Sequence, residues 1–396
     1  MEEWKEVRLG DLCIDNKGSY GIAASAVPYS KDLYTYLRIT DINDDGTLNK
    51  SDLKSVADEN AEQYLLQPND IVFARTGGST GRNYFYDGSD GIFVYAGFLI
   101  KFSIDPIKVN PKYIKYFCLS QEYKNWVYSF NTGSTRGNIN AQTYANMPVI
   151  LPPRSQQDLL VKTLSSLDDK IELNNKINTN LEQQIEALLL DYLSKKETTS
   201  VKLGDYLYIK GRIGWKGLKK NEYLSESKYR IINGETLTKS GIDWNKAGYI
   251  SEERYTESQE IMLQVGDILL SKDGTIGKIG YVDELELPTS VASGIFVIRN
   301  NNPSEISTTF IYYLLKSKLF DSFIIARTEG SVIPHLYQKD FMDFEFPLPS
   351  PELMNEFEKT TSPMFNHIIN NLRENKKLNS LHDSLLPKLM NGDIII

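Results

Sequence analysis

Residues 160–192 read LVKTLSSLDDKIELNNKINTNLEQQIEALLLDY, and large apolar residues recur in them at alternating steps of four and three. Residues 357–389, FEKTTSPMFNHIINNLRENKKLNSLHDSLLPKL, keep the same steps 197 positions later. Such steps turn one stripe of an α-helix towards a partner helix. The first stripe is Leu160, Leu164, Leu167, Ile171, Asn174, Asn178, Leu181, Ile185, Leu188 and Tyr192. The second is Phe357, Thr361, Met364, Ile368, Asn371, Asn375, Leu378, His382, Leu385 and Leu389.

Each stripe is interrupted by two asparagines at matching places, Asn174 and Asn178 in the first and Asn371 and Asn375 in the second. Asparagine at a core position of a coiled coil costs stability but specifies register and partner. We therefore predict that the two helices pair with each other as a coiled coil. The alternative is that each helix packs only on its own domain. That arrangement would not explain why the two stripes share the same spacing and the same asparagine positions. Two prolines, at positions 363 and 387, are expected to kink or break the second helix.

The repeat extends beyond the helices. Val7–Leu12 (VRLGDL) returns as Val201–Tyr206 (VKLGDY), and Asn69–Arg75 (NDIVFAR) returns as Gly266–Lys272 (GDILLSK). A period this long indicates a duplication of whole domains. We predict an α+β chain with two tandem α/β domains at 1–150 and 199–349, and long helices within 151–198 and 350–396.

Composition limits the class of protein. A chain of 396 residues with 41% hydrophobic residues can form two ordinary domains. No apolar run is long enough to span a bilayer, and the N-terminus lacks the pattern of a signal peptide. Two cysteines and three histidines, all scattered, argue against a disulfide framework or a zinc site. We expect a cytoplasmic protein that binds no metal, cofactor or membrane.

The domains themselves are expected to contain mainly short strands. The predicted strands are 36–39, 70–74, 92–102, 229–232, 267–271 and 294–299, and the predicted short helices are 111–119 and 309–315. A Gly-rich loop follows the Asp-Ile strand of each half, but its spacing fits neither a P-loop nor a dinucleotide fingerprint. Two interpretations remain open: a tight turn, or a polar loop that approaches a phosphate backbone. The candidate contacts in these loops are Arg75, Thr76, Ser79, Thr80, Arg82, Lys272, Thr275 and Lys278.

The net charge of −8 means that any contact with nucleic acid needs a locally basic face. Lys210–Lys220 (KGRIGWKGLKK) combines five cations with one aromatic residue, a pattern that suits nucleic acid, although a solvated loop is the alternative. Its candidates are Lys210, Arg212, Trp215, Lys216, Lys219 and Lys220, and the first half offers Lys17 and Tyr20. Two further loops place hydroxyl and amide groups beside a cation, or are simple loops. Their candidates are Ser134, Thr135, Arg136, Asn138, Arg327, Ser331 and His335.

Catalytic constellations are missing from the sequence. There is no Asn-Pro-Pro-aromatic tetrapeptide for amino methylation, and three histidines leave little room for a Ser-His-Asp arrangement. The nearest nuclease-like pieces, Asp70 and Glu122–Lys124, lie more than 50 residues apart. We therefore expect no catalytic residues and no enzyme activity.

Taken together, these residues resemble the specificity (S) subunit of type I restriction–modification enzymes. The resemblance rests on Gly133–Thr135, on Met147–Pro153 (MPVILPP) with Gln156 and Gln157 before the long helix, and on the two-copy order of the whole chain. The second copy departs from it, with Val332 and Ile333 where the first has Thr135 and Arg136.

The resemblance implies a pseudo-twofold molecule that binds double-stranded DNA without catalysis. Two target-recognition domains would each read half of a bipartite site, and two antiparallel helices would hold them apart and dock two methyltransferase (M) subunits. Restriction (R) subunits would join that core. A helix of 33 residues, or roughly 50 Å, would act as a ruler between the half-sites. The alternative is a stand-alone bilobed DNA-binding or scaffold protein without methyltransferase partners.

Overall fold

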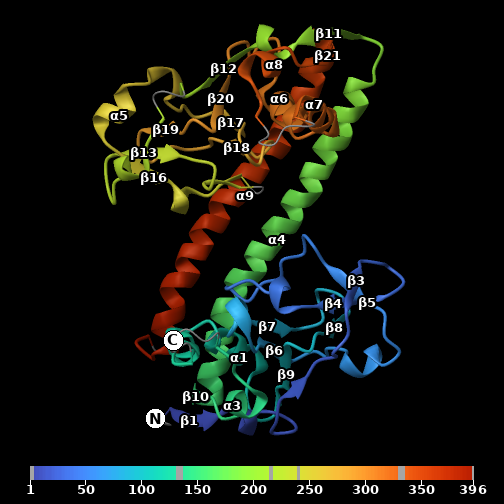
Figure 1. Ribbon diagram of the computed structural model, residues 1–396, viewed down its shortest axis with the longest axis vertical. Helices are drawn as coiled ribbons and strands as arrows, with labels where there is room; N and C mark the ends of the chain where they lie inside the picture. The colour runs from blue at the N-terminus through green and yellow to red at the C-terminus, as the bar shows by residue number, and fades with distance from the viewer. Residues whose placement is uncertain (1–3, 131–136, 214–216, 239–240, 329–334, 395–396) are drawn as a thin grey trace. The chain divides into compact units, whose positions relative to one another are not determined.

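A computed structural model of the chain describes residues 4–130, 137–213, 217–238, 241–328 and 335–394 (Figure 1). The chain divides into two compact units. Unit 1 consists of Met1–Glu172 with Asn375–Ile396, and unit 2 consists of Leu173–Glu374. Two long helices, α4 (Arg154–Leu193) and α9 (Pro351–Met390), each contribute a part to both units. Because helices and short strands alternate along the described chain, the predicted α+β class is confirmed.

Unit 1 contains two four-stranded sheets. The first has the order β2-β9-β6-β7 and is antiparallel, and the second has the order β3-β5-β4-β8 with β4 and β8 parallel. The strands are β2 (Ser19–Tyr20), β3 (Ala26–Pro28), β4 (Tyr34–Leu37), β5 (Lys54–Val56), β6 (Asp70–Ala74), β7 (Asn83–Tyr86), β8 (Phe93–Tyr95) and β9 (Leu99–Ser103). A separate antiparallel pair joins β1 (Lys5–Arg8) to β10 (Pro148–Leu151). The short α-helices are α1 (Pro111–Phe117), α2 (Gln121–Tyr128) and α3 (Ala141–Ala145), and single helical turns are η1 (Leu9–Leu12), η2 (Ile39–Asp41), η3 (Ala61–Tyr64) and η4 (Gly77–Ser79).

Unit 2 repeats this plan. Its four-stranded antiparallel sheet has the order β12-β20-β17-β18, and a three-stranded sheet has the order β16-β13-β19. The strands are β12 (Leu207–Gly211), β13 (Tyr229–Ile232), β16 (Gly248–Ile250), β17 (Ile268–Ser271), β18 (Ile279–Tyr281), β19 (Thr289–Val291) and β20 (Ile295–Asn300). Two further pairs join β11 (Thr198–Lys202) to β21 (Glu345–Pro349) and β14 (Leu237–Thr238) to β15 (Gly241–Ile242). The short α-helices are α5 (Glu252–Thr256), α6 (Thr308–Leu315), α7 (Lys318–Thr328) and α8 (Gln338–Met342), and single helical turns are η5 (Leu203–Asp205), η7 (Lys220–Glu222), η8 (Trp244–Lys246) and η9 (Gln259–Ile261).

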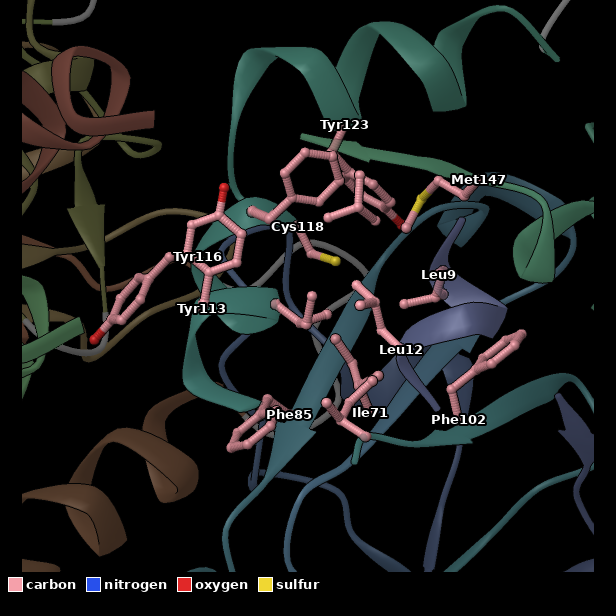
Figure 2. Close-up of a cluster of buried hydrophobic side chains, with 14 of the residues drawn as sticks. Leu9, Leu12, Ile71, Phe85, Phe102, Tyr113, Tyr116, Cys118, Tyr123 and Met147 are labelled. Atoms are coloured by element: carbon pink, nitrogen blue, oxygen red, sulfur yellow. The ribbon is translucent and has the colours of Figure 1, made fainter. Parts of the chain in front are cut away.

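The central strand of each unit is buried on both faces. In β6, Ile71 and Phe73 point into one hydrophobic cluster while Val72 and Ala74 point into another, as the two-residue period of a strand requires. Figure 2 shows side chains of the first cluster converging from η1, β6, β9, α1 and α2. Burial on both faces explains why this strand reads as a continuous apolar run, and why its predicted bounds of 70–74 are confirmed.

Two predicted strands differ from the structure. The expected strand 36–39 is placed two residues too late, because β4 is Tyr34–Leu37 and Ile39 begins a helical turn. The expected strand 92–102 is divided into β8 and β9, because a turn at 96–98 sends the two pieces into different sheets. Strand 229–232 coincides with β13. Helix α1 begins with Pro111 behind Asn110, whose side chain accepts a hydrogen bond from the Lys112 N–H, a common helix start.

Each long helix runs for 40 residues. None of the twenty predicted stripe residues is exposed, although Leu173, Leu190, Leu372 and Leu381, outside the stripe, are. The expected break in the second helix does not occur. Pro363 and Pro387 both lie on an exposed face, where the carbonyls that lose an N–H partner remain open to water.

Within each unit, α4 and α9 are antiparallel neighbours. In unit 2, the Asn174 side-chain amide donates a hydrogen bond to the Glu374 carboxylate (2.8 Å), and the Asn371 amide donates one to the Asn178 side-chain oxygen (2.8 Å). Further along, the centroid of the Tyr192 ring lies 5.5 Å from that of Phe357. The partner numbers on α9 fall as those on α4 rise. In unit 1, Leu160 and Leu164 share a hydrophobic cluster with Leu386 and Leu389, which again joins the start of α4 to the end of α9.

Candidate nucleic-acid interface

The first candidate surface lies where β6 ends and the Gly-rich loop begins. The Arg75 N–H donates to the Phe98 carbonyl (3.0 Å), and the Arg75 carbonyl accepts from the Ile139 N–H (2.9 Å). Thr76 and Asn138 form an isolated antiparallel bridge. Three stretches that are far apart in the sequence therefore meet at Arg75.

Aromatic and hydroxyl groups surround this cation. The Arg75 guanidinium lies 5.1 Å from the centroid of the Tyr20 ring, and the Tyr20 hydroxyl accepts from the Ala141 N–H (3.1 Å). The Thr80 hydroxyl donates to the Gly137 carbonyl (3.0 Å). Among the described residues, no group accepts a hydrogen bond from the Arg75 Nε. A guanidinium held on an aromatic ring beside hydroxyl and amide groups can contact phosphates or base edges.

Unit 2 builds the same junction at the end of β17. The Lys272 N–H donates to the Gly294 carbonyl (2.9 Å), and the Lys272 carbonyl accepts from the Leu336 N–H (2.9 Å). Asp273 and His335 form the isolated bridge that Thr76 and Asn138 form 197 residues earlier. The backbone frame is thus duplicated.

The side chains on this second frame are different. The Lys272 ammonium lies 3.5 Å from the Asp273 carboxylate and 5.4 Å from the centroid of the Phe296 ring. The His335 imidazole pairs with the same carboxylate and meets the Tyr337 ring edge-on at 4.5 Å. The second junction therefore carries less net positive charge than the first.

The remaining candidates divide into paired and exposed residues. Arg82 pairs with Asp44 (2.7 Å), Arg327 pairs with Asp340 (3.3 Å), and the Lys278 ammonium donates to a backbone carbonyl. Ser79 is half-buried, and the exposed candidates are Lys17, Lys210, Lys219, Lys220 and Thr275. Six candidates lie outside the described residues: Ser134, Thr135, Arg136, Trp215, Lys216 and Ser331.

Arg212 does not fit the role of a direct phosphate contact. It is only 3% exposed, and its Nε donates to the Val291 carbonyl (3.0 Å). Burial, followed by repulsion from Arg254, lowers the pKa of its guanidinium. The basic pattern of Lys210–Lys220 could not separate this inward-facing cation from its exposed neighbours.

Two aromatic residues beside the junctions were not among the predicted contacts. Phe98, next to Arg75, is 57% exposed, and Tyr337, next to His335, is 64% exposed. Exposed aromatic rings can stack on bases or pack on sugars. The sequence feature that could have indicated an exposed Phe98 is Gly97, because a glycine that interrupts an apolar run is typical of a turn.

The described residues hold no group of three or more His, Cys, Asp or Glu side chains that could bind a metal ion. Nor does the described part of the chain contain a helix with the length and apolar character needed to cross a bilayer.

Comparison with known proteins agrees with the duplicated frame. The family described as type I restriction modification DNA specificity domain matches the chain twice, over residues 1–183 and 195–380. The HindI specificity subunit of Haemophilus influenzae is 22% identical over 477 aligned residues, which cover all of both chains. The MjaVIII specificity subunit of Methanocaldococcus jannaschii is 22% identical and covers 99% of this chain and 93% of its own.

A solved structure has a similar fold. The S subunit of a type I restriction–modification system from M. genitalium superposes with a TM-score of 0.57 at 19% identity, covering 98% of this chain and 96% of its own. The family matches extend over more than nine-tenths of the sequence. The chain belongs to the family of type I restriction–modification DNA specificity subunits, which target these enzymes to DNA and are not themselves catalytic.

Proposed function

We propose that this chain recognises a bipartite, asymmetric site on double-stranded DNA, with each unit reading one half. One observation carries the proposal: both units build the same backbone junction, but the side chains on it differ. The first presents Arg75, Tyr20 and Asn138, and the second presents Lys272 and His335. Because base edges are distinguished by the donors and acceptors that face them, one frame with two sets of side chains suits two different half-sites.

We further propose that the chain works in the cytoplasm with two methyltransferase (M) subunits and with restriction (R) subunits. The net charge of −8, and the carboxylates beside Arg82 and Lys272, predict weak DNA binding by the chain alone. The M subunits would then supply much of the positive field. The predicted stripe residues face inward, so docking would use other faces of the long helices, where Leu173, Leu190, Leu372 and Leu381 are exposed.

The long helices would pair as an antiparallel coiled coil with pseudo-twofold symmetry and set the gap between the half-sites. The matched stripes, their asparagines and the antiparallel contacts within each unit support this arrangement.

The test is co-expression of the chain with its neighbouring genes, followed by pull-down, mass measurement and mapping of methylated DNA. We expect one chain with two M subunits, and methylation at a site with two separated specific halves. A chain that purifies alone and binds DNA tightly would contradict the proposal and favour the stand-alone binder.

A further inference from the structure

Arg212 occupies a position that is a glycine in the first half of the chain. Lys210 pairs with Val297 in the sheet of unit 2, and Ser19 pairs with Lys101 in that of unit 1. Val297 and Lys101 pair with equivalent positions of the central strands β17 and β6, so Arg212, two residues after Lys210, corresponds to Gly21. The duplicated fold has thus placed a buried cation where the first half has no side chain. A buried cation is costly unless its partners are well placed.

The partners of Arg212 come from two other segments. Besides the Val291 carbonyl, the Ser290 hydroxyl lies 3.3 Å from Nη2, which places the guanidinium against β19. Its Nη1 lies 4.0 Å from the Glu257 carboxylate, just after α5. Among the described residues, no group accepts a hydrogen bond from this Nη1. Arg212 therefore ties the end of β12 to β19 and to the segment after α5.

The ionic contacts continue from Glu257 towards the exposed lysines. Glu257 also pairs with Arg254, whose Nε lies 3.0 Å from a Glu222 carboxylate oxygen. The other carboxylate oxygen of Glu222 accepts from the Lys219 N–H (2.7 Å), and an Arg254 Nη donates to the Gly217 carbonyl (3.2 Å). A continuous series of contacts thus links the buried guanidinium to the backbone that carries Lys219 and Lys220.

We propose that Arg212 is a positioning residue for half-site recognition by unit 2. It holds segment 217–222 in place through Glu257 and Arg254 and touches no DNA itself. The inference rests on the proposed function, because it assumes that this segment lies against DNA. The inference goes beyond the proposed function because it assigns a role in DNA specificity to Arg212, a buried residue that cannot contact DNA.

The test compares Arg212→Ile, which replaces the buried guanidinium with an apolar side chain, with Lys220→Ala, which removes an exposed cation. Each chain is assembled with its M subunits and titrated, over a series of salt concentrations, with intact DNA and with DNA scrambled in one or the other half-site. For Arg212→Ile we expect at least a tenfold loss of discrimination at one half-site only. Lys220→Ala should instead weaken binding to intact and scrambled DNA alike and reduce the salt slope by roughly 0.9.

Equal losses at both half-sites in Arg212→Ile, or no loss at either, would overturn the proposal. If Arg212→Ile does not fold, Glu257→Gln cuts the same series of contacts one step further out. It should reproduce the loss at a single half-site, and normal discrimination would reject the proposal. Should the wild-type complex itself fail to distinguish intact from scrambled DNA, the proposed function fails first.

Discussion

At the scale of single residues, asparagines interrupt the seam between the long helices in unit 2. The Asn371 side-chain amide donates to the Asn178 carbonyl oxygen (2.8 Å), and both residues are buried. A polar pair in an apolar seam is satisfied in one register and left without partners in others. The bond therefore contributes less to total stability than to the choice of register.

Replacing one member of this pair should cost more than replacing both. Asn178→Leu leaves the Asn371 amide buried without this partner, and we expect it to lower the free energy of unfolding by about 1–3 kcal/mol. The double variant, Asn178→Leu with Asn371→Leu, should be close to wild type, because two apolar groups can replace a buried polar pair at little cost.

Urea unfolding of the wild type, Asn178→Leu, Asn371→Leu and the double variant gives the coupling energy between the two residues. Asn379→Leu, at an exposed position of α9, is the matched control and should have little effect. Additive losses in the double variant would show that the hydrogen bond does not couple the two helices.

At the scale of elements, the two units pack a short helix against the long helices with different chemistry. In unit 1, the Asp168 carboxylate accepts from Lys115 (2.8 Å) and from the Tyr116 hydroxyl (2.9 Å), and His382 lies 3.8 Å away. The residues 197 positions from these four are Phe365, Tyr312, Tyr313 and Ile185. They are buried or half-buried in one hydrophobic cluster of unit 2. The duplicated packing thus tolerates either a polar or an apolar filling.

This comparison predicts that His382→Ile stabilises the chain. Within the described residues, the buried His382 Nε2 has no hydrogen-bond partner, and such a group costs free energy that isoleucine does not. We expect a gain of about 1 kcal/mol in the free energy of unfolding at pH 8. His367→Ile, at an exposed position of the same helix, is the control and should change stability by less than about 0.5 kcal/mol. A loss of stability in His382→Ile would mean that the imidazole makes a net favourable contact with Asp168.

At the scale of the whole molecule, the prediction concerns the long helices as a ruler. One heptad inserted into both α4 and α9 adds about 10 Å of helix and preserves the stripe. We expect the methylated site to keep its two half-sites and to gain about three base pairs between them, at 3.4 Å per pair. The measurement is a methylation map of DNA from cells that express the variant with its M subunits.

The control is a heptad inserted into only one helix. This insertion shifts the register between the two stripes, and we expect it to abolish methylation. Unchanged spacing in the double insertion would reject the ruler.

Local pattern was enough to predict the features that depend on periodicity. The steps of four and three place a helix at residues 160–192, and the 197-residue offset reveals the duplication, because both are properties of neighbouring or repeated sequence letters. Strand β6 could be predicted for the same reason, since a short apolar run bounded by polar residues, here Asn69 and Arg75, is typical of a buried strand.

Only the tertiary structure decided which of these residues face water. Arg212 is buried because β19 and the segment after α5, both distant in sequence, close over it, and Lys210 two positions earlier is exposed. Pro363 is compatible with an unbroken helix because its ring lies on the exposed face, where water can bond to the freed carbonyl. Amino-acid type and spacing determine how a segment can fold, but burial depends on contacts between segments that local periodicity does not encode.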